Sequence, residues 1–324
     1  MKVKLNHWIL LLFLIVGQSA FAQKFAVIGD YGWNPNNKQS IHYQADRDKV
    51  MIRGQLAIKV VSDMVKSWNP DFIVSLGDDS YWCRLQNNFA DNVEPFYGSY
   101  VRAGKFFPVL GNHDYKTNIP DIGDCTRGGK NGETLWKEYF SRNSTYYDYV
   151  RGDIHFFAMN FNPEEKDGRD VNSKQAQWLK RKLAASTAKF KVVYGHQPVY
   201  ASCPKGDKHC SNPVLQWPYR KWGADVVLNG DNHYYERNLI DNYTYVVNGV
   251  GGAALDVRGS TIPGTTVKHF PSGSSDKRWG AMLFEVKHDN GDYLNIKMYD
   301  HNKRIFDQFI VWPNKFQWRA CGKE

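Results

Sequence analysis

The sequence predicts an α/β fold, because short apolar runs alternate with helical patterns along most of the chain. Each apolar run has the length of a buried strand and is followed by Gly, Asp or Asn, residues typical of turns. After Tyr243 the pattern changes, since further strand-like runs follow one another with little helix between them. We therefore expect an α/β arrangement that ends in a more antiparallel sheet.

The first 22 residues have the layout of a cleavable secretory signal peptide. Lys2 and Lys4 precede the apolar run Trp8–Val16, and Ala20-Phe21-Ala22 follows. The run is well short of the roughly 20 apolar residues that span a bilayer. We expect a secreted or periplasmic protein that begins near Gln23 and has no membrane attachment after signal cleavage.

Strands and helices are then predicted in alternation. Buried strands are expected at residues 25–28, 72–76, 107–110, 192–194 and 226–228, and C-terminal strands at 245–247, 282–286, 293–299 and 305–311. A helix is expected over Asp48–Trp68, because apolar residues recur there at intervals of four: Ile52, Leu56, Val60, Met64 and Trp68. Ser173 can cap a second helix, which carries Ala176, Leu179 and Leu183. No linker or repeat divides residues 23–324, so we expect a single domain.

The charge and the cysteines restrict the function. The formal charge is +9 and falls to +7 when the two lysines of the signal peptide are removed. A positive net charge favours an anionic ligand. Because the basic residues are scattered along the sequence, the charge does not indicate nucleic-acid binding. Five cysteines in an exported chain predict disulfides. We expect Cys203 to pair with Cys210 and Cys83 with Cys125, which leaves Cys321 unpaired.

Polar residues follow five of the predicted strands directly. The motifs are Gly29-Asp30, Gly77-Asp78-Asp79-Ser80-Tyr81, Gly111-Asn112-His113-Asp114, Gly195-His196 and Gly230-Asp231-Asn232-His233. Each motif alone is a common turn. Since ligands collect beyond the carboxyl ends of strands in α/β sheets, we expect the five loops to converge on one edge and form a shared site.

The order of these motifs resembles that of the purple acid phosphatases, within the calcineurin-like metallophosphoesterases. The resemblance runs from about Phe25 to Arg237, and the chain is similar to the small, single-domain, tartrate-resistant type. Tyr81 is the most discriminating residue, because the wider superfamily generally lacks this tyrosine. The resemblance implies a two-sheet sandwich flanked by helices.

The resemblance also implies two metal ions. Asp30, Asp78, Tyr81 and His233 are implied to hold Fe(III), a hard cation that favours anionic oxygen donors. A second, divalent ion (Fe, Zn or Mn) is implied to bind Asp78, Asn112, His196 and the residue at position 231. The family has histidine at that position, whereas this sequence has Asp231. We expect the second ion to be retained, with a preference shifted toward oxygen-loving metals.

Together with the signal peptide, the resemblance implies a secreted acid phosphatase that hydrolyses small phosphate monoesters with a metal-bound hydroxide. His113 is expected to face the substrate and to stabilise or protonate the leaving oxygen. Asp114 either orients His113 or is a simple turn carboxylate. We expect a monomer that binds neither nucleic acid nor membranes.

Two alternative functions remain compatible with the sequence. The first is a metal-dependent phosphodiesterase or nucleotide pyrophosphatase of the same superfamily. The second is an exported metal- or phosphate-binding protein whose catalysis is impaired by Asp231.

Overall fold

The structure is a computed structural model that describes residues 23–33, 48–81, 88–115, 118–119, 123–124, 132–203, 210–256, 260–269 and 277–314. The expected disulfide between Cys203 and Cys210 is present. The signal peptide and Cys83, Cys125 and Cys321 lie outside the described residues.

One sheet has six strands in the order β17-β16-β15-β1-β4-β5. Its parallel half comprises β1 (Lys24–Ile28), β4 (Phe72–Ser75) and β5 (Phe106–Pro108), with Val27 opposite Val74. Its antiparallel half comprises β15 (Gly280–Lys287), β16 (Tyr293–Asp300) and β17 (Ile305–Val311). The antiparallel C-terminal sheet is thus confirmed for the last three strands, and it continues the same sheet as β1.

The other sheet has seven strands in the order β14-β12-β13-β11-β10-β9-β8. Its members are β8 (Tyr147–Arg151), β9 (Ile154–Ala158), β10 (Phe190–Tyr194), β11 (Val226–Asn229), β12 (Tyr235–Ile240), β13 (Tyr243–Asn248) and β14 (Thr265–His269). The strand predicted at 245–247 lies here. It runs antiparallel to β12 and parallel to β11, so the expected antiparallel arrangement from Tyr243 onward is confirmed on one side of this strand and is wrong on the other.

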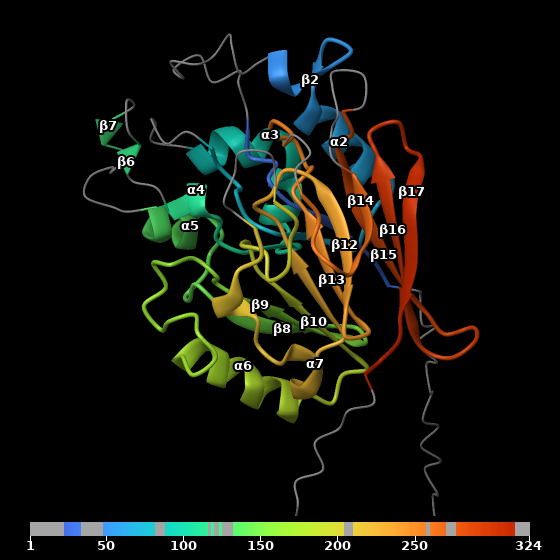
Figure 1. The fold of residues 1–324 in the computed structure, drawn as a ribbon. Helices are drawn as coiled ribbons and strands as arrows, with labels where there is room; N and C mark the ends of the chain where they lie inside the picture. Colours follow the sequence, from blue (N-terminus) through green and yellow to red (C-terminus); the bar gives the residue numbers. More distant parts are fainter. Residues whose placement is uncertain are drawn as a thin grey trace, which may run out of the picture.

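The core lies between the two sheets, and helices cover their outer faces. Along β1, Phe25 and Val27 pack against the second sheet, whereas Ala26 and Ile28 pack against the helix layer. Because both faces of β1 are buried, its sequence is continuously apolar rather than alternating. The helices α2 (Ala57–Ser67), α3 (Asn88–Arg102) and α5 (Gly132–Tyr139) lie over the first sheet. The second sheet is covered by α6 (Lys174–Ala185) and α7 (Tyr219–Trp222) (Figure 1). The two-sheet sandwich flanked by helices is confirmed.

The remaining elements are short. They are the 3₁₀ turns η1 (Asp48–Val50) and η2 (Pro213–Leu215), the strands β2 (Met51–Ile52), β3 (Gln55–Leu56), β6 (Asn118–Ile119) and β7 (Gly123–Asp124), and the helix α4 (Asn112–Tyr115). The prediction of one helix over Asp48–Trp68 is therefore wrong at its start. Residues 51–56 form a hairpin whose turn, Arg53-Gly54, has φ values of 48° and 79°. Such a turn matches the twist of a two-residue hairpin, and it buries Ile52 and Leu56 as a helix would.

The second predicted helix is confirmed. The Ser173 side chain accepts a hydrogen bond of 3.2 Å from the backbone nitrogen of Ala176, at the start of α6. Leu179 and Leu183 are buried on its inner face.

Candidate metal centre

The five predicted loops meet, but they come from two sheets rather than from one edge of a single sheet. The loops after β1, β4 and β5 carry Asp30, Asp78 and Asn112, and they leave the parallel half of the first sheet. The loops after β10 and β11 carry His196 and Asp231, and they leave the second sheet. The candidate site therefore lies where the carboxyl ends of strands from both sheets face each other.

Three aspartates of the site have a left-handed backbone, with φ values of 54° at Asp30, 53° at Asp78 and 70° at Asp231. This conformation is uncommon for residues other than glycine, although aspartate tolerates it better than most. The neighbouring Gly111 allows a close approach, since a Cβ atom there would lie 2.1 Å from Oδ1 of Asp78. The backbone of these loops is thus shaped to point carboxylates at one place.

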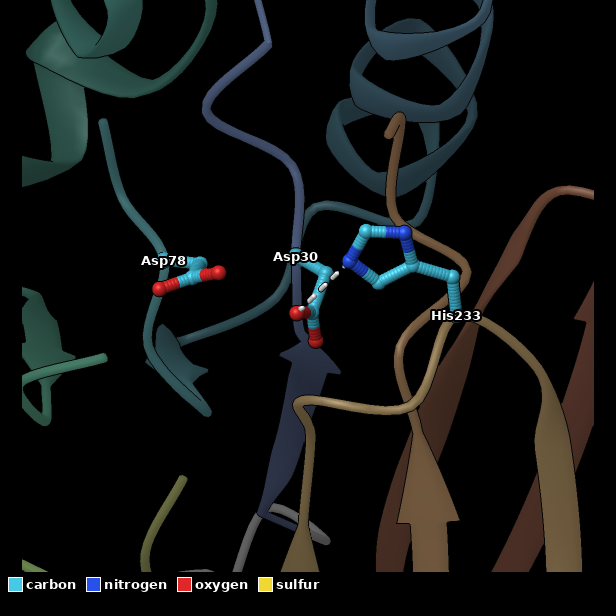
Figure 2. A group of neighbouring side chains, drawn as sticks. All are labelled: Asp30, Asp78 and His233. Atoms are coloured by element: carbon cyan, nitrogen blue, oxygen red, sulfur yellow. Dashed lines mark ion pairs between the residues drawn. The ribbon is translucent and has the colours of Figure 1, made fainter. Parts of the chain in front are cut away.

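A first cluster is formed by Asp30, Asp78 and His233, whose potential ligand atoms lie within 4.8 Å of one another. Figure 2 shows Asp30 just beyond the tip of β1, with the His233 ring directed toward it. Tyr81 joins this cluster, because its hydroxyl donates to Oδ1 of Asp30 at 3.1 Å and lies 2.9 Å from Nε2 of His233. Asp30, Asp78 and Tyr81 are buried.

A second cluster surrounds Nε2 of His196. This atom lies 2.9 Å from Oδ1 of Asn112, 3.3 Å from Oδ1 of Asp78 and 3.4 Å from Oδ1 of Asp231. Asp78 is therefore common to both clusters. The structure brings together all seven residues that the sequence predicted as metal ligands: Asp30, Asp78, Tyr81, Asn112, His196, Asp231 and His233.

Backbone carbonyl groups fix the orientation of both imidazoles. Nδ1 of His196 lies 2.7 Å from the carbonyl oxygen of Leu76, and Nδ1 of His233 lies 2.6 Å from that of Ala254. A carbonyl oxygen can only accept, so each Nδ1 carries the proton. In the neutral imidazole each Nε2 then directs a lone pair toward carboxylate, amide or phenol oxygens, so a cation placed among these atoms would be bound by nitrogen and oxygen donors together. The donors thus fit a pair of metal cations.

The electrostatics of the first cluster lead to the same conclusion. Burial raises the pKa of Tyr81 well above its usual value, and the charges of Asp30 and Asp78 add to this effect. Burial alone would lower the pKa of His233, but the hydrogen bond and charge of Asp30 outweigh it and raise the pKa to about 9. The cluster consequently attracts positive charge, and a cation is what would allow the Tyr81 phenol to ionise.

His113 and Asp114 follow Asn112 in α4 but have different surroundings. The backbone N–H of His113 donates to Oδ1 of Asp78 at 2.9 Å, and its ring lies against Tyr81 with centroids 4.4 Å apart. The His113 side chain is 21% exposed, whereas that of Asp78 is 2% exposed. Asp114 is buried, and its carboxylate accepts backbone hydrogen bonds from Gly111, Asp79 and Ser80.

Sequence reasoning missed Asp256 and the stretch 249–252, which shape the site. Oδ2 of Asp256 accepts a 2.7 Å hydrogen bond from the backbone of His233. The glycine-rich stretch 249–252 was the sequence signal that could have indicated this close packing. A Cβ atom at Gly249 would lie only 2.1 Å from the carbonyl oxygen of Asn232, so a larger residue does not fit there. Close packing of this stretch against the loop after β11 holds His233 in place.

Comparison with known proteins shows which family has this arrangement. Residues 24–235 match the model of the calcineurin-like phosphoesterases. The chain belongs to this family. Among curated relatives, it is 24% identical to tartrate-resistant acid phosphatase type 5 of Homo sapiens, over 71% of this chain and 73% of that one. It is 30% identical to purple acid phosphatase 15 of Arabidopsis thaliana, over 72% of this chain and 46% of that protein.

The metallophosphoesterase also resembles solved structures of related proteins. One is a purple acid phosphatase from seeds of yellow lupin (Lupinus luteus), which aligns with a TM-score of 0.65 at 16% identity. The alignment covers 93% of this chain and 55% of the lupin chain, so this chain spans about half of the plant protein. The resemblance inferred from the motifs is therefore confirmed at the level of family and fold. Within the described residues, no helix is long and apolar enough to cross a membrane.

Proposed function

We propose that this metallophosphoesterase is a secreted acid phosphatase that hydrolyses small phosphate monoesters at a dinuclear Fe(III)–M(II) centre. The observation that carries the proposal is the position of Tyr81, with its hydroxyl 3.1 Å from Asp30 and 2.9 Å from His233. A phenol inserted among carboxylate and imidazole groups supplies a third hard or ionisable donor, which suits a trivalent ion. The similarity to purple and tartrate-resistant acid phosphatases supports the same assignment.

Each residue has a proposed part in holding the two ions. Asp30, Tyr81 and His233 hold the trivalent ion, while Asn112, His196 and Asp231 hold the divalent one. Asp78 would contribute to holding both ions, because it is the member shared by the two clusters. When bound, such a pair supplies Lewis-acid stabilisation of the phosphoryl group and activates water. The second ion is Fe, Zn or Mn, and Asp231 shifts the preference of the site toward the more oxygen-loving of these metals.

His113 is proposed as the group that donates a proton to the leaving oxygen. Its backbone hydrogen bond to Asp78 keeps it beside the cluster, and its side chain is more exposed than the buried ligands. It is therefore placed to meet an incoming ester without being enclosed among the ligands. Asp114 is proposed to position the loops, since its carboxylate ties the turn after β4 to the turn after β5.

The test combines elemental analysis with a panel of phosphate esters across pH. The protein is purified, and its metals are measured by mass spectrometry before turnover is recorded. Iron together with a divalent metal, and preference for monoesters in acid, is the expected result. An iron-free, colourless enzyme that prefers diesters or nucleotide pyrophosphates would instead establish the phosphodiesterase alternative. Full metal occupancy without turnover of any ester would establish a binding protein.

A further inference from the structure

A second pocket lies at the start of β5, whereas the metal centre lies beyond the end of that strand. It has a volume of about 540 Å³ and is lined from the ends of α3 and α5, from β5 and from the end of β8. Three of its lining residues are arginines: Arg102, Arg142 and Arg151. The volume falls in the range of about 300–1,000 Å³ that is usual for small-molecule sites.

The end of α5 determines where Arg142 enters the pocket. Ser141 has a left-handed backbone, with φ of 53°, and the backbone N–H of Arg142 donates to the carbonyl oxygen of Lys137 at 2.8 Å. This hydrogen-bond pattern ends a helix and turns the chain sharply. The guanidinium of Arg142 then lies over Tyr147, 4.5 Å from the ring centroid, and Nη2 donates to the carbonyl oxygen of Phe106 at 2.9 Å.

Arg142 and Arg151 both lie next to the Phe107 ring. Their Cζ atoms are 5.4 Å and 4.9 Å from its centroid. Arg151 reaches this ring because it is on the same face of β8 as Tyr149, which stacks on Phe107 at 4.0 Å. Two guanidinium groups are therefore held beside one aromatic ring, by elements far apart in the sequence.

Neither of these two arginines forms an ion pair with a carboxylate of the described residues. Glu94, the acid of the pocket, is already engaged, since it pairs with Arg102 and accepts a 3.1 Å hydrogen bond from the Tyr139 hydroxyl. Nε of Arg142 is buried and has no hydrogen-bond partner among the described residues. A buried N–H of a charged group that lacks a hydrogen-bond acceptor destabilises the folded protein, unless a bound ligand supplies the acceptor.

We propose that this pocket binds a phosphate dianion, either free or as the head group of a small ester. Guanidinium groups bind phosphate oxygens through paired N–H donors, and two of them here lack a carboxylate. Their approach from different segments, the turn after α5 and the end of β8, suits a tetrahedral group better than a planar carboxylate. The proposal does not depend on which ester the metal centre hydrolyses.

The test is calorimetric titration of the metal-loaded protein with inorganic phosphate and, separately, with phenylphosphonate. Two classes of site are expected, one at the metal centre and one at the pocket. Arg151→Gln should weaken the pocket class about tenfold or more, and so should Arg142→Gln. Asp78→Asn should remove the metal-centre class and leave the pocket class intact, which separates this proposal from the proposed function.

Arg181→Gln is the matched control, because Arg181 is an exposed arginine of α6 and its loss changes the net charge equally. Binding of phosphate alone would assign the free ion, and binding of phenylphosphonate as well would assign the head group of an ester. The proposal is overturned if Arg151→Gln leaves every binding class unchanged, or if succinate binds the pocket as tightly as phosphate. Should Arg142→Gln not fold, Arg151→Gln decides alone, since its guanidinium donates only to the carbonyl of neighbouring Val150 among the described residues.

Discussion

His196 and Asp231 face each other across the second cluster, with Nε2 of the imidazole 3.4 Å from Oδ1 of the carboxylate. Asp231 thus reaches the proposed second metal site in spite of its short side chain. Its left-handed backbone, with φ of 70°, turns the carboxylate toward His196. His233, two residues later, lies at the first cluster, so one loop serves both clusters.

Replacing Asp231 tests the metal preference of the second cluster. With Asp231, three of its four donors are oxygens, which favours Mn(II) over Zn(II) relative to a site with two imidazoles. Asp231→His should raise the ratio of bound Zn to bound Mn by about tenfold. The ratio is measured by mass spectrometry after dialysis against equal concentrations of both ions. Asp241→His is the control, because Asp241 also has a left-handed backbone (φ 50°) but is exposed. An unchanged ratio of Zn to Mn in Asp231→His would show that position 231 binds no metal.

Tyr81→Phe tests the first cluster. The iron-loaded protein should have a visible absorption band from phenolate-to-iron charge transfer, and this variant should lose it while the fold is retained. Tyr97→Phe is the control, since Tyr97 is equally buried but lies in the helix layer over the first sheet. A band that persists in Tyr81→Phe would mean that the tyrosine does not bind the ion.

His113→Ala should lower kcat by about 10² to 10⁴, the usual contribution of a general acid. The loss should be larger for an alkyl phosphate than for 4-nitrophenyl phosphate, because a poor leaving group depends more on protonation. Metal content should stay unchanged. His288→Ala, at an exposed site, is the control. Equal losses for both substrates would contradict a role in leaving-group protonation.

Asp114→Ala should destabilise the protein by roughly 3 kcal/mol or more. The reason is that the backbone N–H groups of Gly111, Asp79 and Ser80 would lose their acceptor in a buried place, at about 1–3 kcal/mol each. Urea unfolding measures the change, with Asp170→Ala in an exposed loop as the control. Normal stability combined with lost turnover would instead support the alternative in which Asp114 orients His113.

Asp225 should make stability depend on pH. Burial raises the pKa of Asp225 to about 6, despite backbone hydrogen bonds from Asn314 and Lys191. The folded state therefore retains a proton that the unfolded chain releases near pH 4, so this stabilisation is present at low pH. It is lost as the pH rises toward and through 6, by about 3 kcal/mol at about 1.4 kcal/mol per pH unit.

The measurement for Asp225 compares the wild type with Asp225→Asn by urea unfolding between pH 4 and pH 7. The difference between the two free energies of unfolding should change over that range, because the amide does not titrate. Two parallel curves would show that Asp225 has an ordinary pKa in the folded protein.

The comparison of sequence with structure is clearest at particular residues. The start of α6 could be predicted, because the Ser173 cap and the spacing of Leu179 and Leu183 are local features. The start of α2 could not, since the hairpin turn at Arg53-Gly54 buries the same residues that the helical pattern would bury. Local periodicity leaves the two arrangements equivalent, and packing against the first sheet decides between them.

The sequence by itself determined which side chains could bind metals, because ligand chemistry belongs to the residue: Asp30, Asp78, Tyr81, His196 and His233 carry it wherever they lie. Only the tertiary structure decided that loops from two different sheets meet, and that Asp78 is shared by both clusters. It also decided that Arg142 and Arg151 flank one ring. The physical reason is that these contacts join residues far apart in the chain, and the packing of the two sheets brings them together.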